Sequence, residues 1–139
     1  MKRFFLVGIS AAILATPSLA GNNKNSLNLK QGNYDLATVD QIGDYNTNGA
    51  SVSQYATSNV TTLKQQGTSN INYSEIVQKG DIENRVKVLQ GGLLSSNTAV
   101  ITQDGRTNET NVDQGGDNNI NWLQVIQTGT GNMANINQK

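Results

Sequence analysis

QTGTGNMANINQ, residues 127–138, contains the pattern that decides the fold of this 139-residue chain. Asn132, Ala134, Ile136 and Gln138 are spaced two residues apart, so in an extended strand their four side chains lie on one face. Two glycines stand between this run and Gln127, where a change of chain direction is easily made. The stretch therefore predicts a turn followed by a short β-strand that ends on glutamine.

The same pattern recurs ten times between residues 25 and 138. Each segment has asparagine, a small residue, an aliphatic residue and glutamine at alternate positions, and Asp35 once replaces the asparagine. The asparagines are Asn25, Asn48, Asn59, Asn72, Asn84, Asn97, Asn108, Asn121 and Asn132. The glutamines are Gln31, Gln41, Gln54, Gln65, Gln78, Gln90, Gln103, Gln114, Gln127 and Gln138. We expect these side chains to form an inward-facing ladder that serves self-assembly.

The connectors between segments alternate in length. Between each glutamine and the next asparagine or aspartate of the pattern lie 3, 6, 4, 6, 5, 6, 4, 6 and 4 residues. The segments therefore pair into five strand-turn-strand repeats with starts 23 to 25 residues apart, a period typical of stacked repeat proteins. The repeats cover residues 25–41, 48–65, 72–90, 97–114 and 121–138. The glycine-rich connectors are predicted turns.

Stacking each repeat on the one before gives an all-β fold, a parallel two-sheet β-solenoid of cross-β type. The short connector would then be an arch between the sheets. An antiparallel hairpin meander is the alternative, and the single repeat period disfavours it. A helical reading fails because the period is two rather than 3.6.

In this arrangement each residue of the pattern lies over the equivalent residue of the next repeat. Alternate glutamines form two columns in which each amide hydrogen-bonds to the copies on either side, and only the end members lack a neighbour. The pattern continues to Gln138, so we expect the last strand to present an open edge to the first strand of another copy.

The first twenty residues differ from the rest. Lys2 and Arg3 precede an apolar run that ends in a small-x-small site at residues 18–20, which predicts a secretory signal peptide. We expect residues 1–20 to be removed, residues 21–24 to be a short N-terminal segment and residues 25–139 to be the repeat domain of a secreted protein.

Composition excludes several function classes. The chain has neither cysteine nor histidine, so it lacks thiol chemistry and the commonest general base and metal ligands. Ten basic and ten acidic residues balance, which disfavours nucleic-acid binding. No apolar run is long enough to span a membrane. We expect a protein without enzymatic activity, cofactor or metal.

Other signals in the sequence are weaker. Asp44, Asp81, Asp104 and Asp117 stand beside glycines, but their spacing does not match calcium-binding nonapeptide turns. Tyr73 and Trp122 share an outward column that is compatible with a sugar-binding or dye-binding strip. In the same stack Asp40 would neighbour Lys64, and Arg85 would neighbour Glu109, with opposite charges on exposed columns.

The repeat resembles that of the curlin family, Ser-x5-Gln-x-Gly-x2-Asn-x-Ala-x3-Gln. Gln127, Gly129, Asn132, Ala134 and Gln138 match it closely, whereas asparagine stands at the leading serine position. Curlins commonly carry a longer segment before the first repeat than the four residues predicted here, and the first and third repeats depart from the common spacing.

The resemblance implies a subunit of curli, the extracellular amyloid fibres of bacterial biofilms. It implies that the chain polymerises with copies of itself on the cell surface. It also implies two further partners, a homologous subunit and an outer-membrane export machinery. A minor nucleating subunit of the same fibres, and a soluble monomeric β-solenoid adhesin that binds glycan or matrix, remain alternatives.

Overall fold

The computed structural model describes residues 24–32, 34–55 and 57–139, without the side chains of Asn25 and Asp81. The predicted signal peptide and residues 21–23 lie outside this part. Ten strands follow one another with no helix among the described residues: β1 Lys24–Lys30, β2 Leu36–Asp44, β3 Thr47–Gln54, β4 Val60–Thr68, β5 Ile71–Ile82, β6 Arg85–Gln90, β7 Ser96–Arg106, β8 Glu109–Gln114, β9 Ile120–Thr130 and β10 Met133–Gln138.

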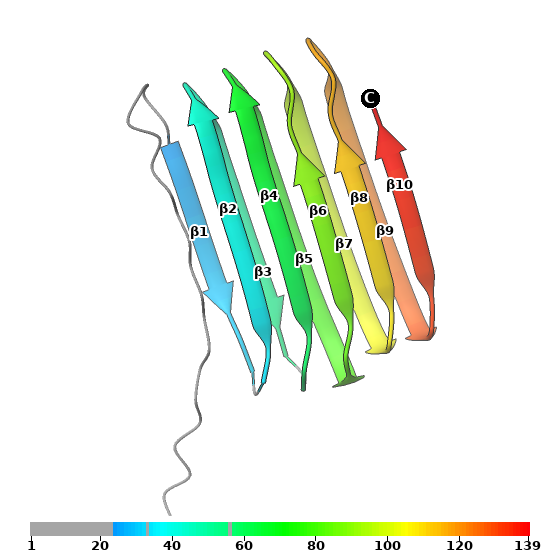
Figure 1. The fold of residues 1–139 in the computed structure, drawn as a ribbon. Coiled ribbons are helices and arrows are strands. Elements are labelled where there is room, and N and C mark those ends of the chain that lie inside the picture. The colour runs from blue at the N-terminus through cyan, green and yellow to red at the C-terminus, as the bar shows by residue number, and fades with distance from the viewer. Residues whose placement is uncertain (1–23, 33, 56) are drawn as a thin grey trace, which may run out of the picture.

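The strands form two parallel five-stranded sheets. Sheet A has the order β1-β3-β5-β7-β9, and sheet B has the order β10-β8-β6-β4-β2. Figure 1 shows the sheets one behind the other, with each repeat contributing one strand to each sheet. This is the predicted five-turn β-solenoid. The hairpin meander is wrong, because consecutive strands lie in different sheets.

The predicted register is confirmed along the stack. Val52 pairs with Ile76, and Ile76 pairs with Ile101, so the aliphatic position of one repeat lies over that of the next. In sheet B, Gln65 pairs with both Gln41 and Gln90. The extra residue of the third repeat is accommodated by an irregularity between Lys79 and Ile82, after which pairing resumes.

The core is a thin layer between the sheets. Small and aliphatic residues fill its middle, and rows of buried amides border them on both sides. The buried hydrophobic residues are Ala37, Val39, Ala50, Val52, Leu63, Ile76, Val86, Val88, Ala99, Ile101, Val112 and Val125. Leu27, Leu29, Leu123, Ala134 and Ile136, all on the terminal repeats, are only partly buried against this layer.

The connectors correct one sequence prediction. Glycines expected in turns, such as Gly43 and Gly67, lie inside β2 and β4 and pair with each other. Both adopt positive φ, and a Cβ on Gly43 would stand 1.8 Å from the carbonyl oxygen of Gly67. The strands continue through these positions because glycine stacks on glycine with no side chain between the backbones.

Candidate functional site: the amide columns and the terminal repeats

The predicted glutamine columns are present. In sheet A, Nε2 of each glutamine donates to Oε1 of the next, with distances of 3.1, 2.9, 3.0 and 2.8 Å from Gln31 through to Gln127. In sheet B the corresponding distances are 2.8, 2.9, 2.9 and 2.8 Å from Gln41 through to Gln138. The interior members are almost fully buried, so each column replaces hydration by protein hydrogen bonds.

Both columns point the same way. Every Nε2 faces the C-terminal repeat and every Oε1 faces the N-terminal repeat. At one end, Oε1 of Gln31 is buried without a hydrogen-bond partner among the described residues. At the other end, the donors Gln127 and Gln138 reach, within residues 24–32, 34–55 and 57–139, just the backbone carbonyls of Glu109 and Trp122. The sheet A column therefore ends in an unpaired acceptor at the N-terminal end, and both columns end in amide donors at the C-terminal end.

The glutamines also join the two sheets. Nε2 of Gln65 donates to the carbonyl oxygen of Gly49 at 3.1 Å, and Nε2 of Gln90 donates to that of Tyr73 at 3.0 Å. In the other direction, Thr61 donates its hydroxyl to Oε1 of Gln78 at 2.9 Å. Each column consequently holds the arches closed as well as the repeats together.

The asparagines fall into two classes, whereas the sequence predicted one. In sheet A they form a side-chain ladder: Asn72 donates to Asn48, Asn97 to Asn72 and Asn121 to Asn97, at 2.9 to 3.0 Å. This ladder runs opposite to the glutamine columns. Asn25 pairs with Asn48 in register, and its side chain lies outside the described part of the structure.

The second class stands at the corners of the short arches. Oδ1 of Asn59 accepts the backbone N–H of Asn84 at 3.2 Å, and Oδ1 of Asn84 accepts that of Asn108 at 3.1 Å. The same bond links Asn108 to Asn132. Asp35 keeps this acceptor role toward the N–H of Asn59 at 2.8 Å, so its replacement of asparagine preserves the corner.

Sequence reasoning missed equivalent corners in the long connectors. Oδ1 of Asn46 accepts the N–H of Asn70, and Oδ1 of Asn70 accepts the N–H of Ser95, both at 2.9 Å. Asn119 occupies the same place in the last repeat and bonds back to Gly115. The sequence signal for these corners is an additional asparagine two positions before each of Asn48, Asn72 and Asn121.

In the described part of the chain, seven non-glycine residues with φ between 52° and 66° precede corner residues. They are Tyr34, Tyr45, Ser58, Ser69, Leu94, Thr107 and Asn118. This left-handed backbone turns the chain at a single residue, and the corner hydrogen bond compensates for the strain. Tyrosine and leucine are not typical turn residues, which explains why the sequence did not reveal these positions.

The outward charges follow the predicted register with one change of partner. Asp40 pairs with Lys64, and Arg85 pairs with Glu109, as expected. The guanidinium of Arg85, however, makes its ion pair with Glu83, two residues earlier in the chain. Glu83 raises the pKa of Arg85 through hydrogen bonding and charge attraction.

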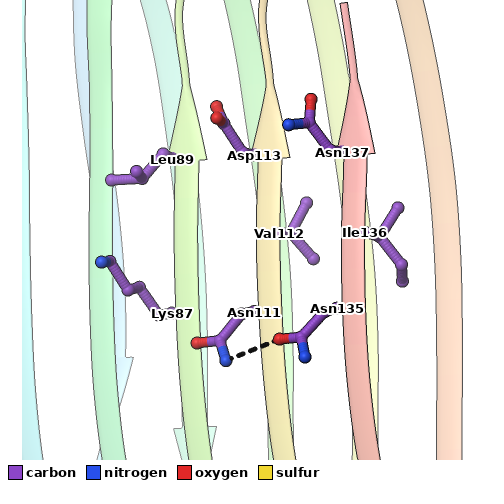
Figure 2. Close-up of a pocket in the computed structure, with 8 residues that line it drawn as sticks. All are labelled: Lys87, Leu89, Asn111, Val112, Asp113, Asn135, Ile136 and Asn137. Atoms are coloured by element: carbon purple, nitrogen blue, oxygen red, sulfur yellow. Dashed lines mark hydrogen bonds between the residues drawn. The ribbon is translucent and has the colours of Figure 1, made fainter.

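A shallow groove of about 390 Å³ lies on the outer face of sheet B. Figure 2 shows polar and charged side chains on three neighbouring strands around it, with Asn111 donating to Asn135 at 2.9 Å. It holds one amine, Lys87, and one carboxylate, Asp113. Throughout the described residues, no three carboxylate, histidine or cysteine groups gather as a metal site would require.

The terminal repeats are the least complete part of the ladder. Ile136 and Gln138 on β10, and Leu123 on β9, face inward but remain partly exposed. Among the described residues, no strand pairs with the outer edges of β1, β2, β9 or β10. Each end of the solenoid thus presents two strand edges with amides and apolar side chains between them.

Comparisons with known proteins leave the chain without a family assignment. No protein-family model, curated protein or solved structure matches it. The described residues also contain no helix of the length and hydropathy needed to cross a membrane.

Proposed function

We propose that this chain is a secreted structural subunit that adds end to end to further copies of itself and so forms an extracellular amyloid fibre. The observation that carries the proposal is the polarity of the glutamine columns. Gln127 and Gln138 face outward with N–H groups, and Gln31 at the opposite end has a buried Oε1 without a donor among the described residues. Such ends are complementary head to tail.

The internal register gives the contact between copies. If β9 pairs with the partner's β1 as β7 pairs with β9, Leu123 lies over Leu27 and Gln127 over Gln31. In sheet B, Ile136 then lies over Val39 and Gln138 over Gln41. The new contact repeats the one already made four times within each chain, so it needs no rearrangement.

The curlin-like spacing of the repeat supports a role in curli-like fibres that serve adhesion and the biofilm matrix. In that role the chain acts without enzymatic activity or cofactor, and its partners are its own copies, a homologous subunit and an outer-membrane export machinery. The proposed end contacts fit a major subunit and a nucleating subunit of such fibres equally.

The test is fibre formation by purified residues 21–139. We expect a thioflavin signal that seeds accelerate, sedimentation within hours, and X-ray reflections near 4.8 Å and about 10 Å. A chain that stays monomeric and does not respond to seeds would contradict the proposal and favour a soluble solenoid adhesin.

A further inference from the structure

One outward column of sheet B carries charges at both of its ends. It consists of the residues that come directly before the glutamine of each strand, namely Asp40, Lys64, Leu89, Asp113 and Asn137. At the N-terminal end a carboxylate on β2 pairs in register with an amine on β4. At the C-terminal end a carboxylate on β8 is followed by an amide on β10, and Figure 2 shows these two side chains on neighbouring strands.

Lys139, directly after β10, reaches into this column. Its Nζ lies 3.9 Å from Oδ2 of Asp113, and both side chains are partly exposed. Since Asp113 pairs in register with Asn137, the lysine crosses diagonally to the neighbouring strand to make this contact. A basic group is thus added to the column at the level where the column itself holds only an amide.

The outer edge of β2, at the opposite end of sheet B, has the complementary charge. β2 carries Asp40 and Asp44 and no basic residue, whereas β10 has no charged side chain besides the adjoining Lys139. The edges of sheet A do not match in this way, because β1 carries Lys24 and Lys30 and β9 carries no charged residue. Charge complementarity between the two ends of the solenoid is therefore confined to sheet B.

We propose that Lys139 bridges Asp113 of its own chain and Asp40 of the next copy, and so joins the charged columns of successive copies. This inference rests on the proposed function and uses its register. Because glutamine lies over glutamine at the junction, Asn137 lies over the partner's Asp40. Lys139 then has Asp113 at a diagonal on one side and the partner's Asp40 at the same diagonal on the other.

The bridge fits the dimensions of a sheet. Asp113 and the partner's Asp40 lie two strand spacings apart, about 9.6 Å, with Asn137 between them. Diagonal neighbours on adjacent strands are about 7 to 8 Å apart, within reach of a long side chain. Without Lys139, the junction would bring together two carboxylates that repel each other. With it, positive and negative groups alternate from Asp113 into the next copy.

The bridge makes assembly sensitive to ionic strength. An exposed ion pair contributes little by itself, and salt screens it further. The same pair forms at every junction, however, and it is absent from the free chain. Weakening it should therefore raise the concentration of free chain that remains in equilibrium with the fibres, called the residual concentration below.

The test is a double-mutant cycle on the residual concentration, measured after fibres of purified residues 21–139 are sedimented from about 0.1 M salt. Asp40→Asn and Lys139→Gln should each raise it by about 1.5- to 5-fold. The double variant should raise it no further than Lys139→Gln does. Within one chain the two residues lie four strand spacings apart, about 19 Å, which exceeds the Debye length of about 10 Å at this salt concentration. Coupling between them therefore reports a contact between copies.

Lys87→Gln is the matched control, because it removes the same charge from the outer face of sheet B in the middle of the stack. Its fold-change and that of Asp40→Asn should multiply, as for independent sites. At about 1 M salt the Debye length is about 3 Å, so the coupling between Asp40 and Lys139 should disappear. All these substitutions lie on the outer face, so the monomer should unfold at nearly the same urea concentration as the wild type.

Two results would overturn the inference. One is a double variant whose fold-change is the product of the Asp40→Asn and Lys139→Gln values at about 0.1 M salt. The other is a coupling of the same size at about 1 M salt, which a screened ion pair cannot give. Failure of the proposed function is distinct, because the wild-type chain would then form no fibres under either condition.

Discussion

At the scale of single residues, the primary amide explains why this chain tolerates so polar an interior. Gln78 donates to Gln103 and to the carbonyl oxygen of Asn84, and its Oε1 accepts from Gln54 and Thr61. Its exposed fraction is 0%. A side chain so fully satisfied costs little to bury, whereas its neighbours depend on it for their own hydrogen bonds.

Replacing Gln78 by alanine should therefore destabilise the fold strongly. The change leaves a cavity and leaves buried groups of Gln54, Thr61 and Asn84 without this partner, at roughly 1 to 3 kcal/mol for each unsatisfied group. We expect the midpoint of urea unfolding of the monomer to fall markedly. Thr62→Ala, an exposed substitution on the outer face, should change the free energy of unfolding by about 0.5 kcal/mol or less. Similar unfolding midpoints for both variants would show that the glutamine column contributes little to the stability of the fold.

At the scale of elements, the strands and their order follow from the sequence because the period is two and the glutamines mark the register. The corners could not be predicted in the same way. The repeats were aligned on their glutamines, and this alignment gives all the asparagines of the pattern one role. Asn48 extends a ladder within a strand, whereas Asn59 holds a corner, and only the three-dimensional position of each distinguishes them. The left-handed Tyr45 and Leu94 carry no turn signal at all.

The glycines inside the strands are a second element-scale feature. Gly67 has φ +134°, and a Cβ there would lie 1.9 Å from Nδ2 of Asn70 and 2.2 Å from the carbonyl oxygen of Gly92. The close stacking of backbones at this position, rather than a turn, requires glycine. From the sequence alone we expected this glycine in a turn, whereas it lies inside β4.

Gly67→Ala should consequently prevent close stacking of the second and third repeats. We expect a loss of several degrees in Tm, since about 1 kcal/mol moves the Tm of a domain of this size by roughly 4 °C. Gly115→Ala is the control, because its Cβ meets only the carbonyl oxygen of Gly91 at 3.9 Å and its backbone has no positive φ. Equal melting temperatures, measured by circular dichroism, would show that the glycine column is not required.

At the scale of the whole molecule, the solenoid has a direction. The glutamine columns run from the first repeat to the last, and the asparagine ladder of sheet A runs back. When two copies meet head to tail, the glutamine columns and the asparagine ladder both continue from one copy into the next. Two copies that meet head to head would oppose donor to donor, which is why we expect polar fibres.

The end members of the columns should control growth. Gln31→Ala/Gln138→Ala removes one amide from each end, and each lost hydrogen bond is worth about 0.5 to 1.5 kcal/mol. We expect seeded elongation to slow by roughly 5- to 150-fold, because two bonds, together worth about 1 to 3 kcal/mol, are lost at each junction. Asn111→Ala on the outer face of sheet B is the control. If the double variant elongates as fast as this control, the amides at the ends of the columns do not control fibre growth.

The axial rise per subunit, measured by helical reconstruction of the fibre from cryo-electron micrographs, tests the central claim most directly. If each chain contributes five rungs and the register continues from one copy to the next, the rise is about five strand spacings, or about 24 Å. A rise of about 4.8 Å, with each chain forming a single layer, would contradict the account.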